Sequence, residues 1–243
     1  MDVSPSSLER LSVVVPVGPG DRMSSQLQAQ LGQLPSAAQV CVVSCEPDNQ
    51  SDESSRSADT PTALGDHTGP RWDPVRSPAG RSLQQNAGAA AADGDWLWFL
   101  HADAALTEET LPALARFIAA DKSALGYFDL HFLGDGPALM RLNAAGVWLR
   151  SHCLRLPFGD QGFVMPRMLF NTLGGFDPAT TRGEDHQLVW RVRRAGYPVR
   201  AVGAPLYTSA RRYAACGWIP TTQMHLVETW RQAWRFSRAE PRL

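Results

Sequence analysis

The stretch that decides the fold is "LSVVVPV", residues 11–17, a run of apolar and β-branched side chains that ends at the turn sequence Gly-Pro-Gly. Such a run predicts a buried strand followed by a turn. Helical periodicity follows over Gln26–Leu34, and "AQVCVVSC", Ala38–Cys45, predicts a second buried strand. A strand, a helix and a strand at this spacing indicate a βαβ unit with a parallel sheet.

The character of the chain changes directly after the second strand. Residues 46–70 contain no strong hydrophobe except Leu64 and are rich in serine, aspartate and glutamate. A segment of this composition cannot bury enough apolar surface to offset the entropy that it would lose on ordering. We therefore expect a mobile acidic loop over residues 46–70.

Strands and helices alternate again beyond this loop. The next part of the chain predicts strands at "RWDPVRSP" and over Trp96–Leu100, and helices over Ser82–Ala92 and Thr107–Ala120. We expect Thr107 to cap the second of these helices and Glu108 and Glu109 to lie in its first turn. The second half predicts strands at "LGYFDLHFL", "QGFVMP" and "VRAVG", and helices over Ala138–Arg150, from "QGFVMP" to Gly174, over Glu184–Arg194 and over Thr221–Phe236. Alternation of this kind is typical of an α/β fold.

Composition limits the class of protein. The chain has 243 residues, 44% of them hydrophobic, which suits one globular domain with a short appendage. It has no run of about 18 apolar residues and no basic start followed by an apolar core, so we expect a cytoplasmic protein without a membrane span or secretory signal. Its four cysteines are too few and too scattered for a disulfide framework, and we expect reduced, mostly packed thiols.

The C-terminal quarter is basic. Residues 182–243 hold eleven arginines and four acids, which fits either an anionic ligand or a solvated face. In the last predicted helix, Val227, Trp230 and Trp234 share one face. We expect that face to pack on the parent domain. The neighbouring Arg231 and Arg235 keep a weak membrane contact or a homodimer contact open.

Two clusters in the first half suit an anionic ligand. Asp103 follows the strand Trp96–Leu100, and an acid beyond the carboxyl end of such a strand either binds a divalent cation or caps a turn. Arg81 stands at the start of a helix, where it can meet an anion. Asn86 and Gly88 on that helix would permit the close approach of a sugar or base. An alanine-rich surface helix would look similar.

Two clusters in the second half suit polar substrates. In "LPFGDQGFVMP", Asp160 and Gln161 lie between two glycines and have the side chains that bind hydroxyl groups, although a tight hairpin is an equal alternative. In "TRGEDHQLVWRVRRAG", Glu184 and Asp185 open a predicted helix, where acids are also ordinary partners of the helix dipole. Taken singly, neither cluster establishes a function.

Together, in this order and spacing, the four clusters resemble the family-2 glycosyltransferases of the GT-A fold. Within them, the pattern "FLHAD…GDQG…ED…SARR" resembles a small bacterial group, and the match runs from about Leu11 to Tyr213. The resemblance implies a single GT-A domain over residues 1–213, with a mostly parallel, twisted, Rossmann-like sheet flanked by helices, and a helical extension over 214–243. It also implies an inverting transfer of a sugar from a nucleotide-diphosphate donor to an unknown acceptor, with Mg²⁺ or Mn²⁺. We expect no nucleic-acid partner.

The resemblance assigns roles residue by residue. Asp103 matches the last acid of the family's DxD motif, which binds the metal, and His101 takes the place of the first acid. Asp185 matches the general base, with Glu184 beside it, and Asp160 and Gln161 are assigned to the acceptor. The donor and its nucleotide are assigned to Pro16, Val17, Glu46, Arg81, Asn86, His101, Ala102, Arg211 and Arg212.

Two donor-site elements depart from the family pattern. The first strand leads into Gly-Pro-Gly-Asp instead of an Asn-Glu pair, which leaves at best Asp21 as the acid. The second strand ends in Ser-Cys-Glu-Pro instead of Asp-Gly-x-Ser-x-Asp, so Glu46 is the only substitute for the base-reading acid. A non-catalytic binding or scaffold protein on the same fold is therefore the alternative hypothesis. A nucleotidyltransferase is a weaker one, because "VGPGDR" is only a faint phosphate loop.

Overall fold

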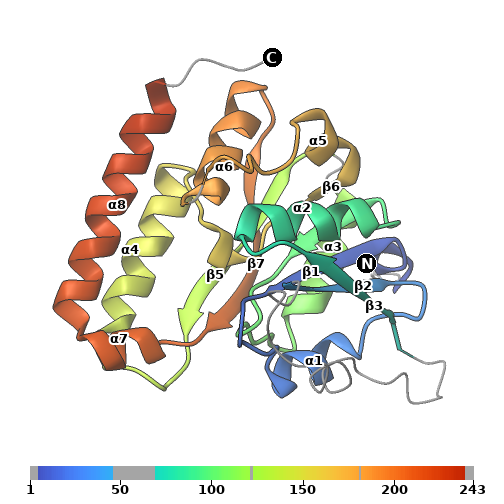
Figure 1. Ribbon diagram of the computed structural model, residues 1–243, viewed down its shortest axis with the longest axis horizontal. Helices are drawn as coiled ribbons and strands as arrows, with labels where there is room; N and C mark the ends of the chain where they lie inside the picture. The colour runs from blue at the N-terminus through green and yellow to red at the C-terminus, as the bar shows by residue number, and fades with distance from the viewer. Residues whose placement is uncertain (1–4, 46–68, 121–122, 181, 239–243) are drawn as a thin grey trace.

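A computed structural model describes residues 5–45, 69–120, 123–180 and 182–238, and these form an α/β structure around one seven-stranded sheet. The strand order is β3-β2-β1-β4-β6-β5-β7, and β6 pairs antiparallel with both β4 and β5 while the other pairs are parallel (Figure 1). The strands are β1 (Leu11–Val17), β2 (Gln39–Cys45), β3 (Arg71–Ser77), β4 (Trp96–Phe99), β5 (Leu125–Phe132), β6 (Val164–Pro166) and β7 (Val199–Thr208). The expected α/β fold with a mostly parallel sheet is confirmed.

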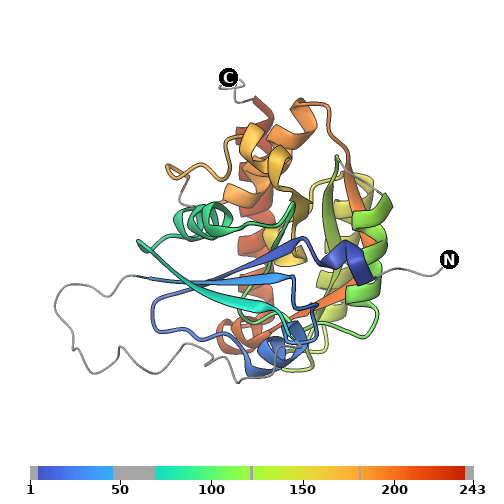
Figure 2. The same cartoon turned by 90° about the vertical axis from the view of Figure 1, so that its right-hand side faces the viewer.

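Helices cover both faces of the sheet (Figures 1 and 2). Two short 3₁₀ helices, Pro5–Leu8 and Gly159–Gln161, accompany them. The α-helices are α1 (Ser25–Leu31), α2 (Arg81–Ala91), α3 (Thr110–Ala120), α4 (Met140–Cys153), α5 (Arg167–Thr172), α6 (Glu184–Arg194), α7 (Arg211–Cys216) and α8 (Trp218–Arg238).

The alternation of side chains along β1 divides the core in two. Val13 and Val15 join the apolar cluster that packs against α1 and α3, whereas Val14 joins the cluster that packs against α2, α5 and α6. Successive side chains of a strand point to opposite faces of a sheet. Because both faces are covered, the strand is apolar on both sides, which explains the hydrophobic run from Val13 to Val17.

Gly88 faces the sheet and not a ligand, which corrects the expectation from sequence. A Cβ atom at this position would lie 2.4 Å from Cγ1 of Val14 and 2.8 Å from Cγ2 of Val43. Both valines are fully buried on strands and have little room to move. Glycine therefore lets α2 lie close to β1 and β2, and this close packing fixes the position of the first residue of α2, Arg81.

Most element predictions are confirmed within one to three residues, and the differences have local causes. α1 ends at Leu31 and not at Leu34, because Gly32 forms its C-terminal cap. α3 begins at Thr110, so Glu108 and Glu109 precede the helix instead of forming its first turn. The hydroxyl of Thr110 accepts a hydrogen bond from the backbone N–H of Thr107 at 2.8 Å, which closes the turn before the helix.

The C-terminal helix departs from its expected packing. Trp230 and Trp234 are 70% and 62% exposed, so the prediction that this stripe packs on the parent domain is wrong. The packed side of α8 instead carries Thr221 and Phe236, which are both buried. No helix within the described residues is long and apolar enough to cross a membrane.

Two further predictions concern the cysteines and the acidic loop. Cys41 is buried, but Cys153 and Cys216 are exposed, so the expectation of mostly packed thiols holds for only part of the set. All four thiols are free. The acidic loop predicted over 46–70 lies outside the described residues except for Gly69 and Pro70.

Candidate active site

The predicted metal-binding segment is a turn directly after β4. The backbone N–H of Ala104 donates to the carbonyl of His101 at 3.1 Å, and that of Ser24 donates to the carbonyl of Ala102 at 2.8 Å. Ser24 is also the N-terminal cap of α1, since its hydroxyl accepts a hydrogen bond from the N–H of Leu27. The start of α1 therefore holds the turn at the carboxyl end of the sheet, where open α/β sheets bind their ligands.

Arg81 joins this turn to the start of α6. Its Nη2 lies 3.3 Å from Nδ1 of His101, and its Nε lies 3.9 Å from Oε1 of Glu184. Burial, together with the nearby guanidinium, holds the pKa of His101 well below its usual value. His101 is thus neutral at pH 7, and because arginine only donates, Nδ1 accepts and the ring proton sits on Nε2. Nε2 is buried and has no hydrogen-bond partner among the described residues.

Asp185 fixes the 3₁₀ helix Gly159–Gln161 against the start of α6. Its Oδ2 accepts a hydrogen bond from the N–H of Gly159 at 2.6 Å, and its Oδ1 accepts one from the N–H of His186 at 2.7 Å. Beside it, Glu184 is only 5% exposed. Burial first, and then the charge of Asp185, raise the pKa of Glu184. The two acids of the predicted "ED" pair therefore lie next to each other, where burial disfavours a second negative charge.

Asp160 is a third acid in this group. Burial is the largest influence on its pKa, opposed by the guanidinium of Arg150 and reinforced by the carboxylate of Asp185. Smaller effects of the same kinds come from Arg81 and Asp103, and the pKa rises to about 6. Its Oδ1 is buried and has no hydrogen-bond partner within the described part of the chain. A carboxyl group with such a pKa can hold or release a proton near neutral pH.

Arg150 is a functional candidate that sequence reasoning missed. It lies on α4, donates through Nη2 to Oε1 of Gln161 at 3.2 Å, and places its guanidinium carbon 3.6 Å from the ring centroid of Phe158. Burial lowers its pKa, and the charges of Asp160 and Asp185 raise it. An arginine within a helix carries no sequence signal of burial, so only the packing of α4 against the 3₁₀ helix reveals it.

Gln161 has its amide satisfied inside the protein. Its Oε1 accepts hydrogen bonds from the hydroxyl of Ser151 at 2.8 Å and from the N–H of Phe158 at 3.1 Å, in addition to the one from Arg150. Its Nε2 donates to the carbonyl of Phe128 at 3.0 Å. The side chain is only 1% exposed, so it is not accessible to an acceptor, and it serves to hold the 3₁₀ helix on β5.

Asn86 likewise bonds to the protein. Its Nδ2 donates to the carbonyl of Phe176 at 2.7 Å, and its Oδ1 accepts from the N–H of Phe176 at 2.9 Å. This pair joins α2 to the segment after α5. Gln84, which sequence reasoning also missed, donates to the carbonyls of Val17 and Val43 at 2.7 and 3.0 Å and so ties α2 to the ends of β1 and β2.

The remaining donor-site residues stay predictions from the sequence. Pro16 and Val17 form the end of β1, with Pro16 half-buried and Val17 buried. Arg211 is exposed at the start of α7, where its Nε donates to the hydroxyl of Ser209 at 2.9 Å. Glu46 and the side chain of Arg212 lie outside the described residues. The structure thus gathers a smaller set at the site: Arg81, His101, Asp103, Asp160, Glu184 and Asp185.

The site can hold the expected divalent cation only through Asp103 together with a bound substrate. Within the described residues, no group of three or more His, Cys, Asp or Glu side chains could hold a metal ion. Asp103 is half-buried, and none of the described residues hydrogen-bonds to its carboxylate. Mg²⁺ commonly takes one or two carboxylates and completes its shell with water and substrate phosphate oxygens. Asp103 fits such a substrate-completed site, and the described residues provide no metal cage of their own.

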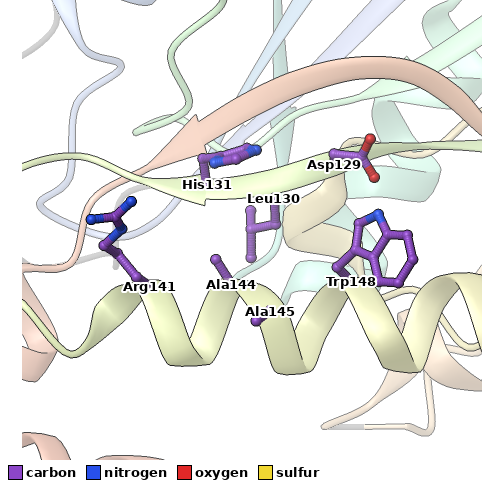
Figure 3. Close-up of a pocket in the computed structure, with 7 residues that line it drawn as sticks. All are labelled: Asp129, Leu130, His131, Arg141, Ala144, Ala145 and Trp148. Atoms are coloured by element: carbon purple, nitrogen blue, oxygen red, sulfur yellow. The ribbon is translucent and has the colours of Figure 1, made fainter.

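A separate hollow of about 340 Å³ lies between β5 and α4 (Figure 3). Asp129 and His131 line it from the strand, and Arg141 and Trp148 line it from the helix, where two alanines leave the space open. Trp148 stacks on His152 with ring centroids 4.5 Å apart.

Comparison with known proteins identifies the fold and the family. The family model described as "Glycosyl transferase family 2" matches residues 48–173, which is just over half of the chain. S. aureus TarS 1-349 in complex with UDP-GlcNAc is 18% identical with a TM-score of 0.55, over 83% of this chain and 59% of that one. GalNAc-T7 with UDP, GalNAc and Mn²⁺ is 14% identical with a TM-score of 0.57, over 83% of this chain and 44% of that one.

At these identities the two solved structures establish the fold, and they confirm the expected GT-A architecture. The chain spans less than two thirds of the length of either relative. No curated protein matches the sequence significantly.

Proposed function

The chain belongs to glycosyl transferase family 2, and from this premise we propose that it transfers a sugar from a nucleotide-diphosphate sugar to an acceptor. The observation that carries the proposal is the gathering of Arg81, Asp103, Asp160 and Asp185 at the strand ends. These residues come from four separate segments, and electrostatic interactions of Asp160 with the other three connect them. A purely structural role would not require a cation and three acids to share one partly buried place.

The donor side of the site is assigned to Asp103 and Arg81. Breaking the bond between the anomeric carbon and the diphosphate leaves negative charge on the leaving group. Asp103 would hold Mg²⁺ or Mn²⁺, which when bound would supply positive charge to that diphosphate. Arg81 is 48% exposed, so its guanidinium can reach a diphosphate oxygen from the start of α2, and neutral His101 keeps it oriented.

The acceptor side is assigned to Asp185, with Asp160 beside it. The acceptor oxygen forms a bond to the anomeric carbon on the face opposite the diphosphate, the old carbon–oxygen bond breaks, and its electron pair leaves with the diphosphate. The proton of the acceptor hydroxyl passes to the carboxylate of Asp185. When Asp160 is ionised, its negative charge favours the transfer of a proton to this side of the site. This sequence of events inverts the anomeric configuration.

A non-catalytic role remains the second candidate because of the departures at the ends of β1 and β2. That hypothesis requires side chains to fill the space near Asp103. Instead, Asp103 is half-buried and Arg81 is about half exposed, which supports a site that is open to solvent. The catalytic proposal is therefore preferred.

Several finer assignments are part of the same proposal. We assign the catalytic unit to residues 1–213 and the helical extension to 214–243, and we place the protein in the cytoplasm. The donor nucleotide is taken as UDP for a first test, since TarS and GalNAc-T7 were both solved with UDP. Membership of the small bacterial group with the "FLHAD…GDQG…ED…SARR" pattern stays a prediction from the sequence.

Calorimetric titration of UDP in the presence and absence of Mn²⁺ tests the donor side. We expect Mn²⁺-dependent binding by the wild type and its loss in Asp103→Asn. Asp95→Asn is the matched control, because Asp95 precedes the same strand that Asp103 follows and forms an exposed ion pair with Arg10. Equal binding with and without metal, or an Asp103→Asn variant that binds like the control, would show that the donor assignment is wrong.

A further inference from the structure

The exposed apolar side chains of this protein gather on two helices. Twelve large hydrophobic residues are exposed among the described residues, and eleven of them lie on α4, on α8 or at the ends of α4. On α4 the most exposed are Leu142 and Leu149. On α8 they are Ile219, Met224, Leu226, Val227, Trp230 and Trp234. We call these eight residues the α4–α8 face. A patch of exposed hydrophobic side chains is typical of an interaction surface.

The two helices are fixed side by side (Figure 1). Asn143 of α4 donates through Nδ2 to the hydroxyl of Thr222 at 3.1 Å and accepts a hydrogen bond from the indole N–H of Trp218 at 2.7 Å. The opposite side of α8 is already in use, since Gln232 lies 3.3 Å from Nδ1 of His186 and Phe236 is buried. The apolar stripe of α8 lies on the side away from these contacts, and its side chains are 44–70% exposed.

Charge determines which partner suits this face. Arg141, Arg231 and Arg235 are exposed on the two helices, and the only acid within their described residues is Glu228. Trp230, Arg231, Trp234 and Arg235 together line a shallow apolar hollow. Trp and Leu on one side, flanked by arginines and nearly free of acids, is the composition of helices that lie in the interface of a bilayer.

We propose that the α4–α8 face docks on the surface of a bilayer that contains anionic lipids. Tryptophan rings and aliphatic side chains would enter the headgroup boundary, while the arginines meet the lipid phosphates. A second copy of this chain is a poorer partner, because a symmetric pairing through this face would bring arginines against arginines with almost no acid to neutralise them. Lipid headgroups provide both the negative charge and the apolar layer that this face needs.

The α4–α8 face lies close to the candidate active site, but its proposed role does not require that site to be catalytic. α8 contacts α6 through Gln232 and His186, and α6 begins with Asp185. Arg150, on α4, interacts with Asp160 and Asp185. Docking through the two helices would therefore place the acceptor side of the site next to the membrane. Vesicle binding is measured without any donor or acceptor, so its failure would leave the proposed transferase activity untouched.

Flotation of the full chain with vesicles tests the proposal. We expect the protein to float with vesicles of phosphatidylcholine and phosphatidylglycerol, and to float much less with phosphatidylcholine alone or at high salt. The double variants Trp230→Ala/Trp234→Ala and Arg231→Glu/Arg235→Glu should each reduce the bound fraction by about tenfold or more. Because all four side chains are exposed, the variants should unfold at the wild-type temperature.

Met168→Ala is the matched control. Met168 is the twelfth exposed large hydrophobe, lies on α5 and is 81% exposed. Its replacement should leave flotation unchanged. The proposal is overturned if the wild type floats with neither vesicle, if the double variants float like the wild type, or if Met168→Ala reduces flotation as much as they do. It is also overturned if light scattering shows a dimer that the same double variants dissociate, since the face then serves a second copy of the chain.

Discussion

Replacement of Asp160 by asparagine should make the protein more stable at neutral pH. Burial, only partly offset by Arg150, raises the pKa of Asp160 from 3.8 to about 6. A raised pKa means that the folded state binds the proton more tightly than the unfolded chain, so ionised Asp160 destabilises the fold. This destabilisation is absent below pH ~4, develops as the pH rises towards the folded pKa, and is complete above pH ~6.

The size of the effect follows from the shift. A difference of about two pKa units corresponds to about 3 kcal/mol, at about 1.4 kcal/mol per unit. Asparagine keeps the shape of the side chain and removes its charge. The free energy of unfolding of Asp160→Asn should therefore exceed that of the wild type by about 2 to 3 kcal/mol at pH 7.5, and the two should be nearly equal at pH ~4.

Urea unfolding from pH 4 to pH 8 measures this difference. The control is Asp95→Asn, whose carboxylate forms an exposed ion pair with Arg10 and should contribute at most about 1 kcal/mol. The substitution should lower turnover while it raises stability. Wild-type turnover should rise through pH ~6 as Asp160 ionises, and the variant should lack this rise. A stability difference that is constant with pH, or a variant less stable than the wild type at pH 7.5, would refute the reasoning.

Three further substitutions test the packing and electrostatics of the site. Gly88→Ala should lower the free energy of unfolding by about 1 to 3 kcal/mol, because the new methyl group overlaps buried valines; a urea titration with no change would contradict this. Asn86→Ala should cost about 1 to 3 kcal/mol by leaving the backbone N–H and carbonyl of Phe176 unpaired, while donor affinity by calorimetry stays the same; a selective loss of affinity would restore Asn86 to the nucleotide site. Arg150→Gln should move the midpoint of the pH–rate profile upward, because Arg150 lowers the pKa of Asp160; a downward shift would show that the two do not interact as described.

The sheet was predictable from sequence because its signals are local. The run Leu11–Val17 is apolar at every position except Ser12, as expected for a strand that is covered on both faces. The strand order is less accessible: the antiparallel insertion of β6 between β4 and β5 depends on four residue pairs that lie far apart in the sequence and that no periodicity marks. The exposure of Trp234 is another long-range property, since helical spacing identifies a face but not what covers it.

Among the residues of the candidate site, the acids could be located from sequence more readily than the amides and the arginine. Asp103 and Asp185 are predicted by their position within connected motifs, and in the structure the charges of both act on Asp160. Asn86 and Gln161 belong to those motifs for another reason, because each satisfies backbone groups of a distant segment. Arg150 could not be found, since its role depends on the packing of α4 against the 3₁₀ helix and not on its neighbours in the chain.

The measurement that tests the central claim most directly is the release of UDP from a UDP-sugar by the wild type and by Asp185→Asn, with the Kd of each for UDP determined in parallel. Asp185→Asn should keep the wild-type Kd within about threefold while its rate of release falls by a factor of about 10² to 10⁴, as expected for loss of a general base. A wild type that binds UDP with Mn²⁺ but releases none from any UDP-sugar, or an Asp185→Asn variant that turns over at the wild-type rate, would contradict the account.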